Sequence, residues 1–155
     1  MTGHGRRMGD APLVLLILYT LFIGLMTLTP YQLDVSPGGP IGKLLEFFAA
    51  HRLTAWLTYT RVELLANVAM FIPFGFLLAL HLGRRRWWLG WVAGAAFTCI
   101  IEGTQATLLS PTRYGTISDL VTNTIGAGVG AVLGLILMVI LPPLKKQDTA
   151  DPVVR

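Results

Sequence analysis

Four long apolar segments constrain this chain more than any other feature of its sequence. They run from Ala11 to about Thr29, from about Leu64 to Leu82, from Trp87 to Leu109, and from about Ile117 to Leu141. At about 1.5 Å per residue, each can cross a hydrocarbon core of about 30 Å. Because lipid offers no partner for backbone polar groups, each segment should be an α-helix. The sequence therefore predicts an all-α integral membrane bundle of four transmembrane helices.

The composition supports a membrane protein and argues against a soluble one. Hydrophobic residues make up 54% of the chain and charged residues only 13%, whereas soluble domains carry about 25% charged residues. The net charge of +4 lies in short basic clusters between apolar segments. This pattern is typical of membrane topology and not of a nucleic-acid-binding surface. A single cysteine, Cys99, excludes an intrachain disulfide.

The basic residues predict how the bundle is oriented. Their densest clusters would share one side of a four-span protein: Arg6 and Arg7; Arg84, Arg85 and Arg86; Lys145 and Lys146. Basic residues are enriched in cytoplasmic loops, so both termini should be cytoplasmic. We therefore predict a cytoplasmic segment at residues 1–10, a membrane domain at 11–141, and a cytoplasmic tail at 142–155 that is expected to be disordered.

The first outer loop carries its own helix pattern, "IGKLLEFFAAHRL" from residue 41. Its apolar residues Ile41, Leu44, Leu45 and Phe48 recur at helical spacing. This amphipathic pattern predicts a short interfacial helix on the outer leaflet or, equally, a short helix packed on the bundle as a lid.

Polar side chains gather at one predicted depth, near the outer ends of the last three spans and in the turn between the last two. They are Glu63, Asn67, Glu102, Gln105, Arg113, Asp119 and Asn123. The paired residues lie three or four positions apart and therefore share helical faces. Those faces continue as small residues, Gly90, Gly94 and Thr98 in one helix and Gly126, Gly130 and Gly134 in the next. Such stripes favour close helix packing and also permit oligomers.

A charged side chain at the bilayer centre costs at least roughly 2.5–3.5 kcal/mol, which favours a function for the carboxylates. Structural alternatives remain for each polar group. Asp119 lies near a helix start, where it could act as a cap. Asn67 and Asn123 could form hydrogen bonds between helices. Pro73 predicts a kink in the second span, with or without a function.

Three parts of the chain resemble the VanZ-like family of small membrane proteins: "NVAMFIPFGFLL" (67–78), Glu102-x-x-Gln105, and "TRYGTISDLVTNTIGAGVG" (112–130). The resemblance covers roughly residues 11–141. Its recurrent positions correspond here to Asn67, Pro73, Glu102, Gln105, Arg113, Asp119 and Asn123. It implies a bacterial plasma-membrane protein of a family named for low-level resistance to the glycopeptide teicoplanin. It implies no particular reaction.

Three functions are open at this point. The first is a protein without catalysis that affects the cell envelope or glycopeptide resistance, its seven polar residues binding a lipid headgroup, a partner or a glycopeptide. The second is a membrane enzyme acting on a lipid-linked envelope precursor, with Glu102, Arg113 and Asp119 as candidate catalytic residues. The third is a small transporter subunit. We expect no metal and no cofactor, because the histidines are scattered and no ligand set is recognisable.

Overall fold

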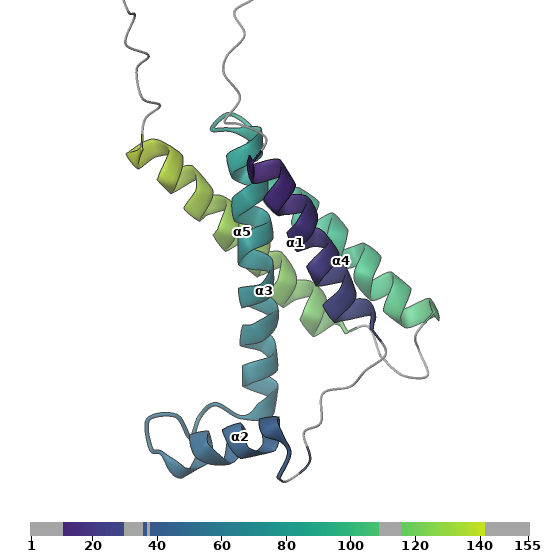
Figure 1. The fold of residues 1–155 in the computed structure, drawn as a ribbon, viewed down its shortest axis with the longest axis vertical. Coiled ribbons are helices and arrows are strands. Elements are labelled where there is room, and N and C mark those ends of the chain that lie inside the picture. Colours follow the sequence, from purple (N-terminus) through teal and green to yellow (C-terminus); the bar gives the residue numbers. More distant parts are fainter. Residues whose placement is uncertain (1–10, 30–35, 37, 109–115, 142–155) are drawn as a thin grey trace, which may run out of the picture.

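The computed structural model describes residues 11–29, 36, 38–108 and 116–141, and the regular elements in these ranges are all helices. The chain forms α1 (Ala11–Leu28), α2 (Pro40–Ala50), α3 (Tyr59–Leu82), α4 (Leu89–Leu108) and α5 (Ile117–Ile140). The predicted all-α class is confirmed. Figure 1 shows α3 and α5 running in the same direction, while α1 and α4 run the opposite way.

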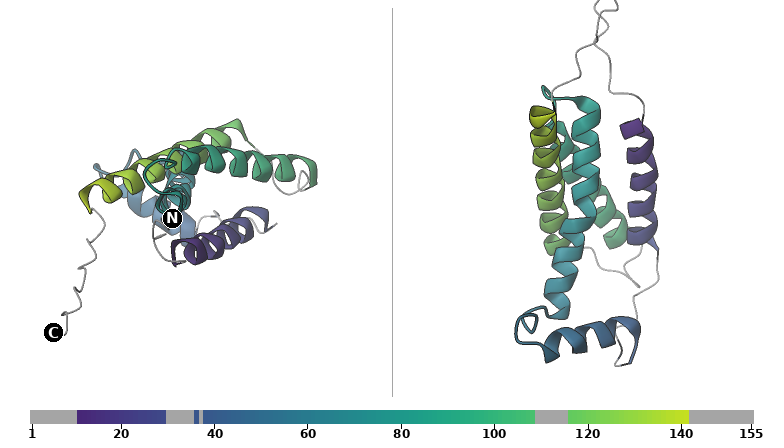
Figure 2. Two further views of the ribbon diagram at one scale, coloured as in Figure 1. Left: turned by 90° about the horizontal axis from the view of Figure 1, so that it is seen from above. Right: turned by 60° about the vertical axis from the view of Figure 1, so that its left-hand side comes forward.

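Three of the described helices, α1, α3 and α5, are long and apolar enough to cross a membrane. The chain is therefore a membrane-embedded protein. α4 falls outside this group, although it has 20 residues, because Glu102 and Gln105 interrupt its apolar sequence. It nevertheless packs against both α3 and α5 (Figure 2).

The predicted glycine-lined faces are confirmed, and they bring the backbones of α3 and α5 into contact. A Cβ atom on Gly130 would lie 1.9 Å from the carbonyl oxygen of Ile72, and one on Gly126 would lie 2.2 Å from that of Val68. On α3, a Cβ on Gly75 would lie 2.0 Å from the carbonyl oxygen of Ala127. No side chain fits in these places. The crossing of α3 and α5 therefore depends on glycine at three positions.

α4 packs on the same core from the other side. A Cβ on Gly94 would lie 2.2 Å from the Cβ of Ala127, so only glycine permits this approach. Between α3 and α4, the aromatic rings of Phe71, Phe74 and Phe97 pack together, with their centroids 5.3–6.2 Å apart. These contacts make α3, α4 and α5 the most closely packed of the described helices.

The first helix, α1, is less deeply packed than α3, α4 and α5. It buries only Leu16, Ile23 and Thr27. The Tyr19 hydroxyl donates a 2.8 Å hydrogen bond to the carbonyl oxygen of Met70 and so ties α1 to α3. Most of the surface of α1 therefore faces its surroundings or a crevice beside α4.

The predicted short helix in the first loop is confirmed as α2, with Pro40 at its start. Figures 1 and 2 show α2 lying crosswise beyond the end of the bundle, next to the start of α3. Its side chains Leu44 and Phe47 are exposed. This position fits the interfacial alternative better than a lid packed on the bundle.

Two predicted helix starts differ from the structure. α3 begins at Tyr59, ahead of the predicted Leu64, because its first turns are polar but still helical. α4 begins at Leu89 and not at Trp87, because turns follow Gly83, whose φ of 79° suits glycine.

Candidate functional site

A hydrogen bond between two side chains joins α3 to the first turn of α5. The Nδ2 atom of Asn67 donates to Oδ1 of Asp119 over 2.6 Å, and both residues are half-buried. These two residues lie 52 positions apart in the chain. The predicted alternative of interhelical bonding therefore describes Asn67 correctly.

The start of α5 is capped by an arrangement that involves two helices. Thr116 is the N-cap residue, and its side chain accepts a 3.0 Å hydrogen bond from the backbone N–H of Asp119. In a capping box, the acidic residue at the third helical position would bond back to the N-cap N–H. Here Oε2 of Glu102, from α4, accepts the Thr116 N–H over 2.8 Å. The carboxylate of Asp119 is thereby left to pair with Asn67.

Gln105 connects α4 to α1 at the same end of the bundle. Its Nε2 atom donates a 2.8 Å hydrogen bond to the carbonyl oxygen of Thr27, in the last turn of α1. The side chain of Gln105 is buried. Together with the bonds of Glu102 and Asp119, this contact brings α1, α3, α4 and α5 together at one end. We refer to Asn67, Glu102, Gln105 and Asp119 as the polar cluster.

Asn123 lies one turn further along α5 than Asp119, deeper in the bundle. Its Nδ2 atom donates a 3.0 Å hydrogen bond to the hydroxyl oxygen of Thr98, on the small-residue face of α4. Both side chains are buried, Asn123 at 2% exposure and Thr98 at 0%. Oδ1 of Asn123 is buried without a partner among the described atoms. Asn123 therefore adds a buried polar contact between α5 and α4, one turn deeper than Asp119.

Two predicted site residues are not brought into these contacts. Glu63 is exposed, one turn before Asn67, where α3 extends beyond the rest of the bundle (Figure 1). It forms no hydrogen bond or ion pair with any other described residue. Arg113 lies outside the described residues.

Sequence reasoning did not single out two of the partners. The spacing Thr116-x-x-Asp119 is a capping signal and would have identified Thr116. No signal identifies Thr27, because its partner group is a backbone carbonyl that every residue carries.

The chemistry of the polar cluster is that of hydrogen bonding. Two carboxylates and two amides offer acceptors and donors at one end of the bundle. Within the described ranges, no three His, Cys, Asp or Glu side chains lie close enough together to hold a metal ion. These hydrogen bonds join α1, α3, α4 and α5 to one another.

The sequence that forms these helices matches the model of a known protein family. The VanZ/LLP1 profile matches residues 13–139, which include every residue of the polar cluster and the glycine faces below it. The chain belongs to the VanZ/LLP1 family. The predicted resemblance is thus confirmed, and in this family member the matched region is the helical bundle. No curated protein and no solved structure matches the chain.

Proposed function

We propose that this VanZ/LLP1 protein acts at the outer face of the bacterial plasma membrane. There the polar cluster binds the headgroup of an envelope lipid or lipid-linked cell-wall precursor and lowers susceptibility to teicoplanin-type glycopeptides. The observation that carries the proposal is the convergence of Asn67, Glu102 and Asp119 from three helices at one end of the bundle. A polar group in this place would interact with ligands at headgroup depth.

The proposed orientation has four spans, with both termini cytoplasmic. Arg84, Arg85 and Arg86 follow α3 at the end opposite the polar cluster and are exposed. Trp88, beside them, is also exposed, as expected at a membrane interface. Basic residues favour the cytoplasmic side, so the polar cluster faces outward. α4 completes the fourth span beside α5.

Binding is favoured over catalysis because the two carboxylates already have structural partners. Glu102 caps the start of α5, and Asp119 bonds to Asn67. Groups held in this way form a preorganised rim for a ligand. A proton-transferring acid or base would instead require a carboxylate oriented toward the reacting atom.

The test measures teicoplanin susceptibility in a sensitive bacterial host that expresses the full chain. Asp119→Ala and Glu102→Ala should each lose the protection given by the wild type while inserting at a similar level. Thr104→Ala is the matched control, because the Thr104 hydroxyl bonds only to the carbonyl oxygen of Ile100 in its own helix. If all variants protect like the wild type, the polar cluster is structural and the proposal fails.

The alternative is an enzyme acting on a lipid-linked envelope substrate. The observation that favours it is the presence of two carboxylates, Glu102 and Asp119, around a single helix turn. Purified protein would be incubated with labelled cell-wall lipid precursors. Turnover that is lost in Asp119→Ala and kept in Thr104→Ala would favour the enzyme.

A further inference from the structure

A crevice of about 480 Å³ lies between α1 and α4. Six of its lining residues come from α1 or directly follow it, and one comes from α4. They are Thr20, Leu21, Gly24, Leu25, Leu28, Thr29 and Phe97. The lining is predominantly apolar, as expected for a surface inside a membrane.

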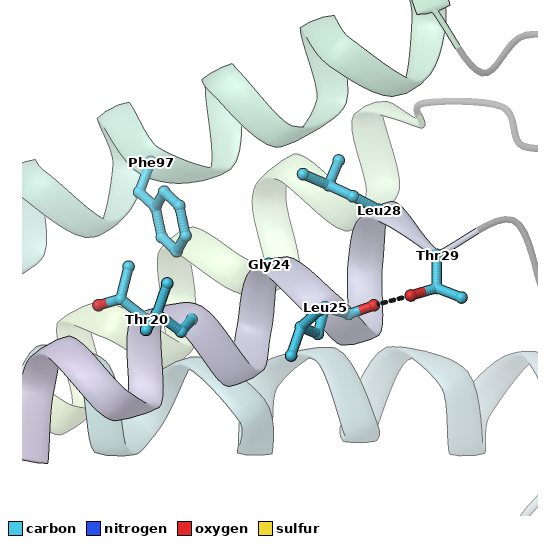
Figure 3. A pocket seen from close by; sticks show the side chains of 7 residues that line it. Thr20, Gly24, Leu25, Leu28, Thr29 and Phe97 are labelled. Carbon is cyan, nitrogen blue, oxygen red and sulfur yellow. Dashed lines mark hydrogen bonds between the residues drawn. The ribbon is translucent and has the colours of Figure 1, made fainter.

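Gly24 makes the crevice open. A Cβ atom on this residue would find nothing within 4 Å, so close helix packing does not explain glycine here as it does at Gly130. Figure 3 shows Phe97 projecting from α4 toward α1 near Thr20, and Leu28 rising from α1 further along. Gly24 lies between them without a side chain.

The length of the crevice corresponds to one leaflet of a bilayer. From Thr20 to Thr29 the helix rises about 14 Å at about 1.5 Å per residue. The hydrocarbon core is about 30 Å thick, so one leaflet is about half of that. The Thr29 end lies beside Thr27, whose carbonyl bonds to Gln105. The crevice therefore runs from the polar cluster to about the middle of α1.

Atoms that line an apolar crevice gain dispersion contacts when an apolar group fills it. α1 is long and apolar enough to cross a membrane, and in a bilayer the medium at the mouth of the crevice consists of acyl chains. A transmembrane helix from a second copy would be longer than the crevice, because it would extend past Phe97 along the whole length of α1. A single acyl chain ends within one leaflet and matches the observed length.

We propose that this crevice holds one acyl chain of a lipid from the leaflet that borders the polar cluster. The chain lies over Gly24 between Leu28 and Phe97, and the headgroup lies at the polar cluster. The position of the headgroup rests on the proposed function, whereas the position of the chain rests on the crevice itself.

The test uses the full chain in vesicles of phosphatidylethanolamine and phosphatidylglycerol, with some of the phosphatidylglycerol carrying a diazirine on one acyl chain. After irradiation, mass spectrometry quantifies the label on Phe97 and on Val139, an exposed residue of α5. We expect label on both residues. Gly24→Leu should remove it from Phe97 and leave Val139 unchanged, because the added side chain occupies the crevice.

Gly103→Leu is the matched control, because Gly103 is also a helix glycine with open space around it, but it lies outside the crevice. It should keep the label on Phe97. Label on Val139 without label on Phe97 in the wild type would overturn the proposal. Label on Phe97 that persists in Gly24→Leu would also overturn it.

A second copy in the crevice is the main competing occupant. With Cys99 replaced by Ala, Leu25→Cys would then form disulfide-linked dimers and Phe97 would remain unlabelled, which contradicts the proposal.

Teicoplanin susceptibility distinguishes a failure of the acyl-chain site from a failure of the proposed function. If Asp119→Ala loses protection but Phe97 is not labelled, only the acyl-chain site fails. If Phe97 is labelled but Asp119→Ala still protects, only the proposed function fails.

Discussion

Asn67 on α3 donates a 2.6 Å hydrogen bond to Asp119 on α5, and this bond joins the two helices whose backbones touch further along at Gly126 and Gly130. The close glycine packing and the polar bond thus act on the same helix pair. The glycine contacts set the crossing of α3 and α5, and the polar bond joins the two helices near the start of α5.

This relationship predicts that Asn67 and Asp119 are energetically coupled. In a double-mutant cycle of Asn67→Ala and Asp119→Ala, we expect a coupling of about 0.6–1.7 kcal/mol in the free energy of unfolding, between the average and the maximum for hydrogen bonds between membrane helices. Unfolding in mixed micelles would measure it. A cycle that pairs Asn67→Ala with Thr104→Ala should be additive. Zero coupling between Asn67 and Asp119 would show that the bond is not formed in the membrane.

The glycine contacts predict unequal effects of two alanine substitutions. Gly130→Ala should destabilise the protein by about 1–3 kcal/mol or more, because the new Cβ must displace the backbone of α3. Gly103→Ala should be neutral or slightly stabilising, since its Cβ meets open space. Equal effects of the two substitutions on the free energy of unfolding would contradict the close packing of α3 and α5.

The limits of the bundle helices could be read from the sequence, because a membrane imposes both a length and an apolar composition on a spanning segment. α1, α4 and α5 begin and end within two residues of their predicted limits. The start of α3 could not be read in this way. Arg61 and Glu63 are compatible with a helix but not with an apolar pattern, so hydropathy marked the apolar part of α3 and not its first turns.

The candidate site was only partly predictable for a related reason. The convergence of Asn67, Glu102 and Asp119 followed from the topology of the spans. Their partners did not, because Glu102 bonds to a backbone N–H and Gln105 to a backbone carbonyl. Such groups occur in every residue and leave no trace in a sequence. The crevice at Gly24 could not be predicted from the sequence either, because it depends on the open space around this glycine in the folded chain.

The cap formed by Glu102 predicts where α5 becomes unstable when this side chain is removed. Glu102→Ala should speed hydrogen exchange at the Thr116 amide, because losing a cap acceptor costs about 0.5–2 kcal/mol. Glu102→Gln should restore part of the protection, since its side-chain oxygen can still accept. Unchanged exchange at Thr116 in Glu102→Ala would show that the cap does not form.

The buried pair of Thr98 and Asn123 predicts a recovery of stability in a double variant. Thr98→Val should cost about 1–3 kcal/mol, because it leaves the amide of Asn123 buried without a partner for either polar atom. Adding Asn123→Leu removes both unpaired groups and should recover most of this loss. The free energies of unfolding of the wild type, the two single variants and the double variant measure the effect. If the double variant is less stable than Thr98→Val alone, Asn123 has a further partner in the bundle.

Sided labelling would show whether the polar cluster faces the outside of the cell, as the proposed function requires. Single cysteines would replace Ser118, at the start of α5, and Arg85, at the opposite end, after Cys99→Ala; both positions are exposed. With a membrane-impermeant maleimide on intact bacteria, Ser118→Cys should be labelled, and Arg85→Cys only after permeabilisation. The reverse pattern would place the polar cluster in the cytoplasm and contradict the account.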